Sequence, residues 1–231
     1  MYFEHAPDIW RDYRDLHAGA IVVNGIRKDV DSTANAAPYL LAAQQRLAAV
    51  GTESEFPEIQ SWRRTFSTMG LKPTQYRCAS ESLLRRLRKE GNLPQIHPLI
   101  DICNAISVAR AIPVAALDLD QIAEGLTVRY ATGDERYQTF GGDIEHPDPR
   151  EVTFVDAANQ SHARRWTNRQ SGLSAIQPTT SRVLIVTEAM HGSADSDVDA
   201  LLRDLANEIE AIWSIPVSPA RLSEAAPRIE F

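Results

Sequence analysis

The segment LPQIHPLIDICNAISVARAIP, residues 93–113, marks the place where the chain changes from helical to strand-like patterns. Pro98 can begin a helix, because the first helical residue has no use for the N–H that proline lacks. The residue before a proline is disfavoured in helical geometry, so a helix would stop at Ile112. Ile102 and Ile106 lie one turn apart and share an apolar face. One helix is therefore predicted between the two prolines.

Three more helical patterns precede this segment. Residues 35–50 are rich in alanine and leucine and are followed by a glycine, and residues 58–70 also end on a glycine. In residues 79–91, Ser80 can cap the start of a helix and Gly91 can end it. The chain before the quoted segment is thus predicted to be mainly helical.

Strand-like runs dominate from the end of the quoted segment onward. Turn residues separate short apolar runs such as GLTVRYA, ARRWT, EVTFVD and RVLIVTE. A further buried strand, AGAIVVNGI, is predicted at residues 18–26, and an amphipathic helix at residues 196–213 follows the last strand. Helices first, strands in the middle and a closing helix predict an α+β fold.

The composition limits the kind of partner. The chain has 231 residues, of which 43% are hydrophobic and 24% charged, as is ordinary for a globular protein. Its net charge of −7 makes it a poor general binder of polyanions, so any contact with nucleic acid needs a local basic patch. Residues 61–90 hold the strongest positive bias, eight Lys or Arg against two acidic residues. Such a run is either a solvated helix face or a nucleic-acid surface.

No cofactor, metal site or membrane segment is expected. Cys78 and Cys103 match neither a disulfide framework nor a metal spacing, and we interpret them as reduced thiols. The six histidines do not pair at metal-ligand spacing. No stretch reaches the roughly 18 apolar residues of a membrane helix, and the start of the chain lacks the features of a signal peptide. We therefore expect a cytoplasmic location.

The stretch RRWTNRQS, residues 164–171, has an unusual hydrogen-bonding capacity for an acidic chain. If it is a strand that enters a turn, Arg165 and Arg169 face the same side. Trp166 either stacks on a base or fills the core. A solvated strand would explain the arginines alone, whereas the amide and hydroxyl groups at the turn favour the wall of a pocket for a polar ligand.

Standard catalytic motifs, including GxSxG, the P-loop and HExxH, are missing. Asp118 and Asp120 would share a strand face, which suits acid–base chemistry, but turn or cap duty is the commoner use. His97 stands at a helix start, where capping or packing is favoured over a role as a base. Cys103 has no cationic partner nearby in the sequence, and we interpret it as a core residue rather than a nucleophile.

Residues 76–131, followed by RRWTNRQS and by TTSRVLIV at residues 179–186, resemble the editing module of the bacterial phenylalanyl-tRNA synthetase β subunit, the B3/B4 domain. The resemblance is greater to free-standing proteins built on that domain, and it runs from about residue 58 to 190. It implies an α+β fold with a mixed, barrel-like sheet core flanked by helices. Residues 1–231 would then form a single domain of this type, with an N-terminal strand and helix and the C-terminal helix packed on it.

In the synthetase, this module hydrolyses the ester of tyrosine wrongly attached to the phenylalanine tRNA, and its functional positions can be carried over one by one. The pocket asparagine falls on Asn104, and the threonine before it becomes Cys103. The histidine eleven positions after the asparagine falls on Ala115. Counting from the matching Asp156, the glutamate that reads the tyrosine hydroxyl falls on Gln170.

The family's glycines, which let the ligand approach the backbone, become Arg164, Arg165, Asn168 and Arg169. An amide is a weaker acceptor for a phenol than a carboxylate, and arginines fill space and add positive charge. The resemblance therefore implies a pocket that does not select tyrosine. A smaller or a negatively charged aminoacyl group is the better hypothesis, with Arg165 or Arg169 pairing to a carboxylate or phosphate.

The expected function is a deacylase that acts in trans on charged tRNA, because the chain has no synthetase core for adenylation. Neutral polar groups would position the water, helped by a hydroxyl of the terminal ribose. The catalytic candidates are Asn104 and Gln170. The other side chains expected to bind substrate are Asp101, Cys103, Ala115, Arg165, Trp166, Asn168, Arg169 and Ser171. The side chains expected to contact tRNA are Arg77, Arg85, Arg86, Arg88 and Lys89.

The expected partners are the 3′ end of a charged tRNA and a free amino acid, with no membrane contact. Two alternatives stay open. The missing histidine and glutamate favour a non-catalytic module that binds tRNA or an amino acid. A hydrolase of small esters or amides would act without RNA. Binding to an RNA backbone should weaken steeply with ionic strength, which separates these cases.

Overall fold

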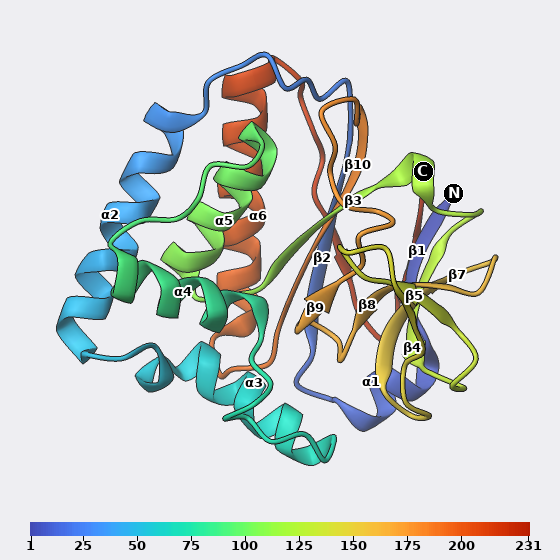
Figure 1. Cartoon of the computed structure of the whole chain (residues 1–231). Coiled ribbons are helices and arrows are strands. Elements are labelled where there is room, and N and C mark those ends of the chain that lie inside the picture. The colour runs from blue at the N-terminus through green and yellow to red at the C-terminus, as the bar shows by residue number, and fades with distance from the viewer.

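The computed structural model describes residues 1–231, with the longer helices on one side and the strands, together with one short helix, on the other (Figure 1). The helices are α1 (Pro7–Asp12), α2 (Thr33–Val50), α3 (Pro57–Thr68), α4 (Ala79–Glu90), α5 (Pro98–Arg110) and α6 (Ala194–Trp213), with two 3-10 turns, η1 (Glu53–Glu55) and η2 (Leu119–Gln121). The strands are β1 (Tyr2–His5), β2 (His17–Asn24), β3 (Val114–Asp118), β4 (Leu126–Tyr130), β5 (Arg136–Gln138), β6 (Ile144–Glu145), β7 (Val152–Asp156), β8 (Gln160–Arg164), β9 (Arg169–Gln170), β10 (Arg182–Ala189), β11 (Ala220–Leu222) and β12 (Arg228–Glu230).

The strands form two sheets. The larger sheet has the spatial order β12-β1-β4-β7-β8-β5-β6, with β9 paired to β8, and the smaller has the order β11-β2-β10-β3. The pairs β1–β4 and β5–β8 are parallel and the others antiparallel, so the larger sheet is mixed. The predicted α+β fold with a mixed sheet flanked by helices is confirmed. Neither sheet closes into a barrel, because β12 and β6 remain at opposite edges of the larger sheet.

The smaller sheet is covered on both faces, since alternate residues of a strand point to opposite sides. On β3, Ala116 faces the side where α5 and α6 pack, whereas Leu117 belongs to the core shared with the larger sheet. Ile185 and Leu184 of β10 divide in the same way. The molecule is therefore layered as helices, small sheet and large sheet, with one hydrophobic core on each side of the small sheet.

The helix predicted from the quoted segment is confirmed. It runs from Pro98 to Arg110, and Ala111 ends it in the left-handed conformation. His97 caps its start, because the ring Nδ1 accepts a hydrogen bond of 3.2 Å from the backbone N–H of Leu99. No helix in the molecule combines the length and the apolar character that crossing a membrane would require.

Both chain ends belong to the larger sheet. Strand β1 pairs with β4 on one side and with β12 on the other, and the ammonium group of Met1 donates to the carbonyl of Phe231 at 2.7 Å. Strand β2 in turn lies inside the smaller sheet, between β11 and β10. The first and last residues thus complete both sheets around the middle of the chain.

The run ARRWT was predicted to be one strand, and this is wrong beyond Arg164. Strand β8 ends there, and the next two residues, Arg165 and Trp166, have φ angles of 48° and 58°. Such left-handed geometry turns the chain before β9 begins. Arg165 and Arg169 therefore do not share a strand face.

Candidate functional site

A cavity of about 70 Å³ lies between the two sheets, and we call it the inter-sheet cavity. Its walls come from the beginning of β3, the middle of β10, and the turn between β8 and β9. Most of the lining is apolar. Five of the residues predicted to bind substrate line it: Ala115, Trp166, Asn168, Arg169 and Gln170.

Gln170 connects the two sheets at this cavity. It belongs to β9 of the larger sheet, and its Nε2 donates to the carbonyl of Ala116 in the smaller sheet at 2.8 Å. Its own backbone carbonyl accepts from the hydroxyl of Tyr137 at 2.7 Å. One N–H of the side-chain amide is thus held by the fold, which fixes the amide and leaves its carbonyl oxygen as an acceptor for a ligand.

Asn168 and Thr167 attach the turn between β8 and β9 to the start of α4. The Nδ2 of Asn168 donates to the carbonyl of Arg77 at 2.6 Å, and the carbonyl of Thr167 accepts from the N–H of Ala79 at 2.8 Å. The hydroxyl of Thr167 is buried without a hydrogen-bond partner, although the residue lines the cavity. A buried hydroxyl without a partner costs free energy, which a hydrogen bond to this group would offset.

The polar group at the other side of the cavity is Glu188, on β10. Its side chain is 2% exposed, and one oxygen, Oε1, accepts from the Nε2 of His5 at 2.6 Å and from the indole Nε1 of Trp166 at 2.9 Å. His5 comes from β1 and lies 183 positions away along the chain. The two sheets therefore meet at a buried carboxylate that lines the cavity.

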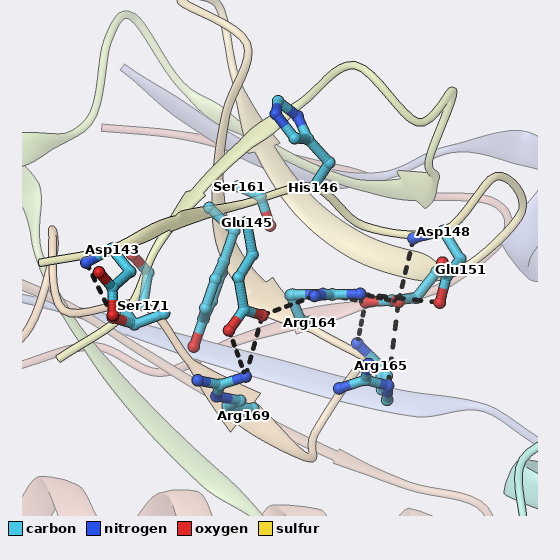
Figure 2. Close-up of polar contacts among 12 residues, drawn as sticks. Asp143, Glu145, His146, Asp148, Glu151, Ser161, Arg164, Arg165, Arg169 and Ser171 are labelled. Atoms are coloured by element: carbon cyan, nitrogen blue, oxygen red, sulfur yellow. Dashed lines mark hydrogen bonds and ion pairs between the residues drawn. The ribbon is translucent and has the colours of Figure 1, made fainter. Parts of the chain in front are cut away.

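The arginines near the cavity are neutralised by glutamates, as Figure 2 shows. Arg164 lies between Glu145 and Glu151, with N···O distances of 2.8 Å to the first and 2.9 Å to the second. Arg169 contacts Glu145 at 3.0 Å. Burial raises the pKa of Glu145, but hydrogen bonds and charge from Arg164 and Arg169 outweigh it and lower that pKa overall.

Two residues predicted for the pocket lie outside it. The guanidinium of Arg165 stacks on Tyr76, 4.6 Å from the ring centre, and its backbone N–H donates to Glu151 at 2.8 Å. Ser171 is buried, and its hydroxyl donates to the carbonyl of Gln138 at 2.8 Å. Arg165 and Ser171, which were predicted to bind substrate, therefore do not line the inter-sheet cavity, and each of them holds the local fold.

Asn104 and Gln170, the two catalytic candidates, do not line the same cavity. Asn104 and Asp101 line a different cavity, between α5 and α2, and the small sheet separates it from the inter-sheet cavity. Asp101 accepts there from the N–H of Ile96 at 2.8 Å. The reason is helical spacing. Ile102 and Ile106 occupy the side of α5 that faces the small sheet, so Asn104 lies on a different side of the helix.

Cys103 is likewise outside the site. It is buried in the core between α5 and the small sheet, and burial raises the pKa of its thiol to about 12. A thiol with so high a pKa is not a nucleophile at neutral pH. Cys78 is buried and unpaired as well. No three side chains of His, Cys, Asp or Glu gather as ligands of a metal ion.

The predicted tRNA-binding arginines are more neutral in the fold than along the sequence. Arg85 and Arg88 both contact Glu53, at 3.4 and 2.7 Å, and that carboxylate comes from η1, outside the basic segment. Arg77 lies 3.5 Å from the buried Glu81. Arg86 pairs with the exposed Glu90 at 2.8 Å. Lys89 is exposed and makes no ion pair, so it is the freest of the five cations.

Two polar residues of the site were missed from the sequence, namely Glu188 and His5. A signal for the first was present, because Glu188 interrupts the apolar run RVLIVTEA, where a buried strand should have no carboxylate. His5 had no such signal. It stands in a short strand whose place in the larger sheet follows only from pairing with distant strands.

The comparisons with known proteins agree on one family. The family model of the B3/4 domain matches residues 61–210. The chain is 39% identical over 54 residues to the phenylalanine–tRNA ligase beta subunit of Coxiella burnetii (strain RSA 493 / Nine Mile phase I), which covers 23% of this chain and 7% of that subunit. An N-terminal fragment of the phenylalanyl-tRNA synthetase β subunit from Pyrococcus horikoshii has the same fold, with a TM-score of 0.52 and 8% identity over 95% of this chain and 53% of that one.

Proposed function

The chain belongs to the B3/4 domain family, and on that premise we propose that it hydrolyses the ester between a small amino acid and the 3′ end of a tRNA. The observation that carries the proposal is the inter-sheet cavity. Two segments far apart in the sequence, β3 and the turn from β8 to β9, bring Ala115, Asn168 and Gln170 to its wall, at the positions where the resemblance implies substrate contacts. A tRNA is the proposed partner because the similar proteins are named as subunits of a tRNA ligase, and it would bind in trans.

The size of the cavity supports a small aminoacyl group. The volume is about 70 Å³, whereas an apolar cavity that holds benzene measures about 150 Å³. A phenylalanine or tyrosine ring does not fit this space without movement of the walls. A glycyl, alanyl or seryl group does, with room for a water molecule.

The charges around the cavity argue against an acidic aminoacyl group. Arg165 stacks on Tyr76 outside the cavity, and Arg169 contacts Glu145. The carboxylate of Glu188, by contrast, lines the cavity itself. An aspartyl or glutamyl side chain would meet a like charge there.

The chemistry would be a direct attack of water on the ester. The carbonyl oxygens of the Gln170 and Asn168 side chains can accept hydrogen bonds from the water, because one N–H of each amide donates to a backbone carbonyl and fixes the amide in place. The free hydroxyl of Thr167 can donate to the oxygen that gains negative charge. The water oxygen bonds to the carbonyl carbon, the bond to the ribose oxygen breaks, and that oxygen takes the proton. The products are a free amino acid and uncharged tRNA.

Turnover of a panel of charged tRNAs tests this function. We expect release of glycine, alanine or serine and none of tyrosine or phenylalanine. Ala115→Leu should reduce the rate at least tenfold, because the added atoms fill the cavity. Asn104→Ala serves as the control and should leave the rate unchanged, since that side chain lies in the other cavity.

Failure to release any amino acid from any tRNA would contradict the proposal. Salt-sensitive binding of charged tRNA without turnover would identify a non-catalytic module instead. Equal turnover of a free amino-acid ester and the matching charged tRNA would identify a hydrolase of small esters. Each result is read from the same purified protein.

A further inference from the structure

We propose that Glu188 binds the protonated α-amino group of the aminoacyl moiety, so that the enzyme acts only on amino acids with a free amine. This inference rests on the proposed function, and it names a specificity-determining residue for that reaction. It starts from the environment of one carboxylate at the wall of the inter-sheet cavity.

The two oxygens of Glu188 have different surroundings. Oε1 accepts from the Nε2 of His5 at 2.6 Å and from the Nε1 of Trp166 at 2.9 Å. No side chain or backbone group of the protein donates to Oε2, although the residue is 98% buried and lines the cavity. His5 and Trp166 thus fix the carboxylate in position and leave one oxygen for a ligand.

A second buried pair of histidine and carboxylate, His162 and Asp156, shows what a purely structural arrangement looks like. Both oxygens of Asp156 are used: Oδ1 accepts from the backbone N–H of Ala158 and Gln160 at 3.0 and 2.9 Å. Oδ2 accepts from the N–H of Ala123 at 3.0 Å and from His162 at 3.2 Å. Glu188 differs from it by its unused oxygen and by its place at a cavity.

The unused oxygen of Glu188, Oε2, favours a positively charged hydrogen-bond donor. A carboxylate in apolar surroundings costs free energy unless each oxygen is hydrogen-bonded, and a charged donor makes the stronger bond. Glu188 is the one acidic residue that lines the cavity, and the one basic residue there, Arg169, is held by Glu145. A small aminoacyl group carries one charge, the ammonium next to its ester. That ammonium is therefore the group of the substrate that complements the cavity.

The inference predicts discrimination against blocked amines. An N-acetyl group removes the charge, and it adds atoms that a cavity of about 70 Å³ does not hold beside the side chain. Alanyl-tRNA should thus be a substrate, and N-acetylalanyl-tRNA should not.

The experiment has a binding part and a kinetic part, both on the full chain. Calorimetry compares alaninamide with N-acetylalaninamide, and we expect at least a tenfold preference for the free amine. Hydrolysis compares alanyl-tRNA with its N-acetylated form. Glu188→Gln should abolish both preferences and raise KM more than tenfold with kcat within about threefold. Asp156→Asn, the matched change in the other buried pair, should keep both preferences.

The possible failures can be told apart. Equal handling of free and blocked amines by the wild-type protein overturns the inference, whether or not Glu188→Gln folds. A collapse of kcat in Glu188→Gln with the amine preference intact also overturns it, because the carboxylate would then act on the water. Preferential binding of alaninamide without turnover of any charged tRNA supports the amine site and contradicts the proposed function alone.

Discussion

At the scale of single residues, Trp166 combines deep burial with a backbone conformation that is rare for a residue with a side chain. Its ring is 1% exposed, and it packs edge-on against Tyr13 and Trp62 at centroid distances of 4.7 and 5.3 Å. The side chain therefore fills the core and does not stack on a base. Its positive φ costs free energy, roughly 1–2 kcal/mol for a residue with a side chain. The indole N–H offsets part of this cost by donating to Glu188.

Trp166→Phe should lower the free energy of unfolding by more than Trp213→Phe does. The indole of Trp166 donates to a carboxylate, a type of bond that contributes about 1.5–3 kcal/mol. The indole of Trp213 donates to the neutral carbonyl of Arg27, which contributes about 0.5–1.5 kcal/mol. Both tryptophans are buried, 1% and 3% exposed, and both variants remove the same atoms, so urea unfolding followed by circular dichroism compares the two hydrogen bonds. Equal losses would show that the Glu188 bond has no special weight.

At the scale of elements, α4 shows how a charge pattern changes its meaning when the chain folds. The helix was predicted from a capping serine and a closing glycine. It ends at Glu90 with Gly91 in the left-handed conformation, whereas Cys78, and not Ser80, takes the cap position at its start. Its arginines were interpreted as a possible RNA surface. The neighbouring η1 places the carboxylate of Glu53, 4% exposed, against two of them. Part of the basic face is thus an internal contact between two elements.

Arg88→Gln should destabilise the protein rather than only weaken its contact with RNA. The Nε of Arg88 lies 2.7 Å from the buried Glu53, and loss of this charged hydrogen bond leaves that carboxylate with Arg85, at 3.4 Å, as its only ion pair, so the free energy of unfolding should fall by more than in the control. Arg86→Gln is the control on the same helix. Its partner Glu90 is exposed, so the change should stay within about 0.5 kcal/mol. Chemical unfolding measures the change in the free energy of unfolding for both variants. Similar changes in the two would contradict a structural role for the contact between Arg88 and Glu53.

At the scale of the whole molecule, acid stability depends on buried carboxylates that the sheets hold ionised. Burial alone would raise the pKa of Glu135, but backbone N–H groups of Thr132 and Gly133 and the Arg129 guanidinium outweigh it and lower the pKa to about 2. The pKa of Asp156 is lowered as well, since His162 and backbone N–H groups outweigh its burial. In the unfolded chain such groups regain their ordinary pKa near 4.

The free energy of unfolding should therefore fall as the pH drops from about 4.5 toward 2. Over this range the unfolded chain binds protons that the folded protein does not, so acid favours unfolding. Urea unfolding at a series of pH values measures the slope. Glu135→Gln should reduce the slope, whereas Glu224→Gln, at an exposed position, should not change it. An unaltered slope in Glu135→Gln would show that carboxylates other than Glu135 cause the loss of stability in acid.

The sequence by itself determined every helix except α1, the change to strands after Pro113 and the α+β class, because periodicity, caps and turns are local properties of the chain. Ala115 and the other residues predicted for the cavity wall came from the resemblance to the B3/B4 domain. For Trp166, Asn168 and Gln170 the sequence also indicated a wall, since they lie within one short turn. Only the tertiary structure moved Asn104 to another cavity and brought His5 to Glu188, 183 positions apart. Which side of α5 faces the sheet, and which strand joins β4, follows from packing and pairing between distant segments, and these are properties of the assembled core.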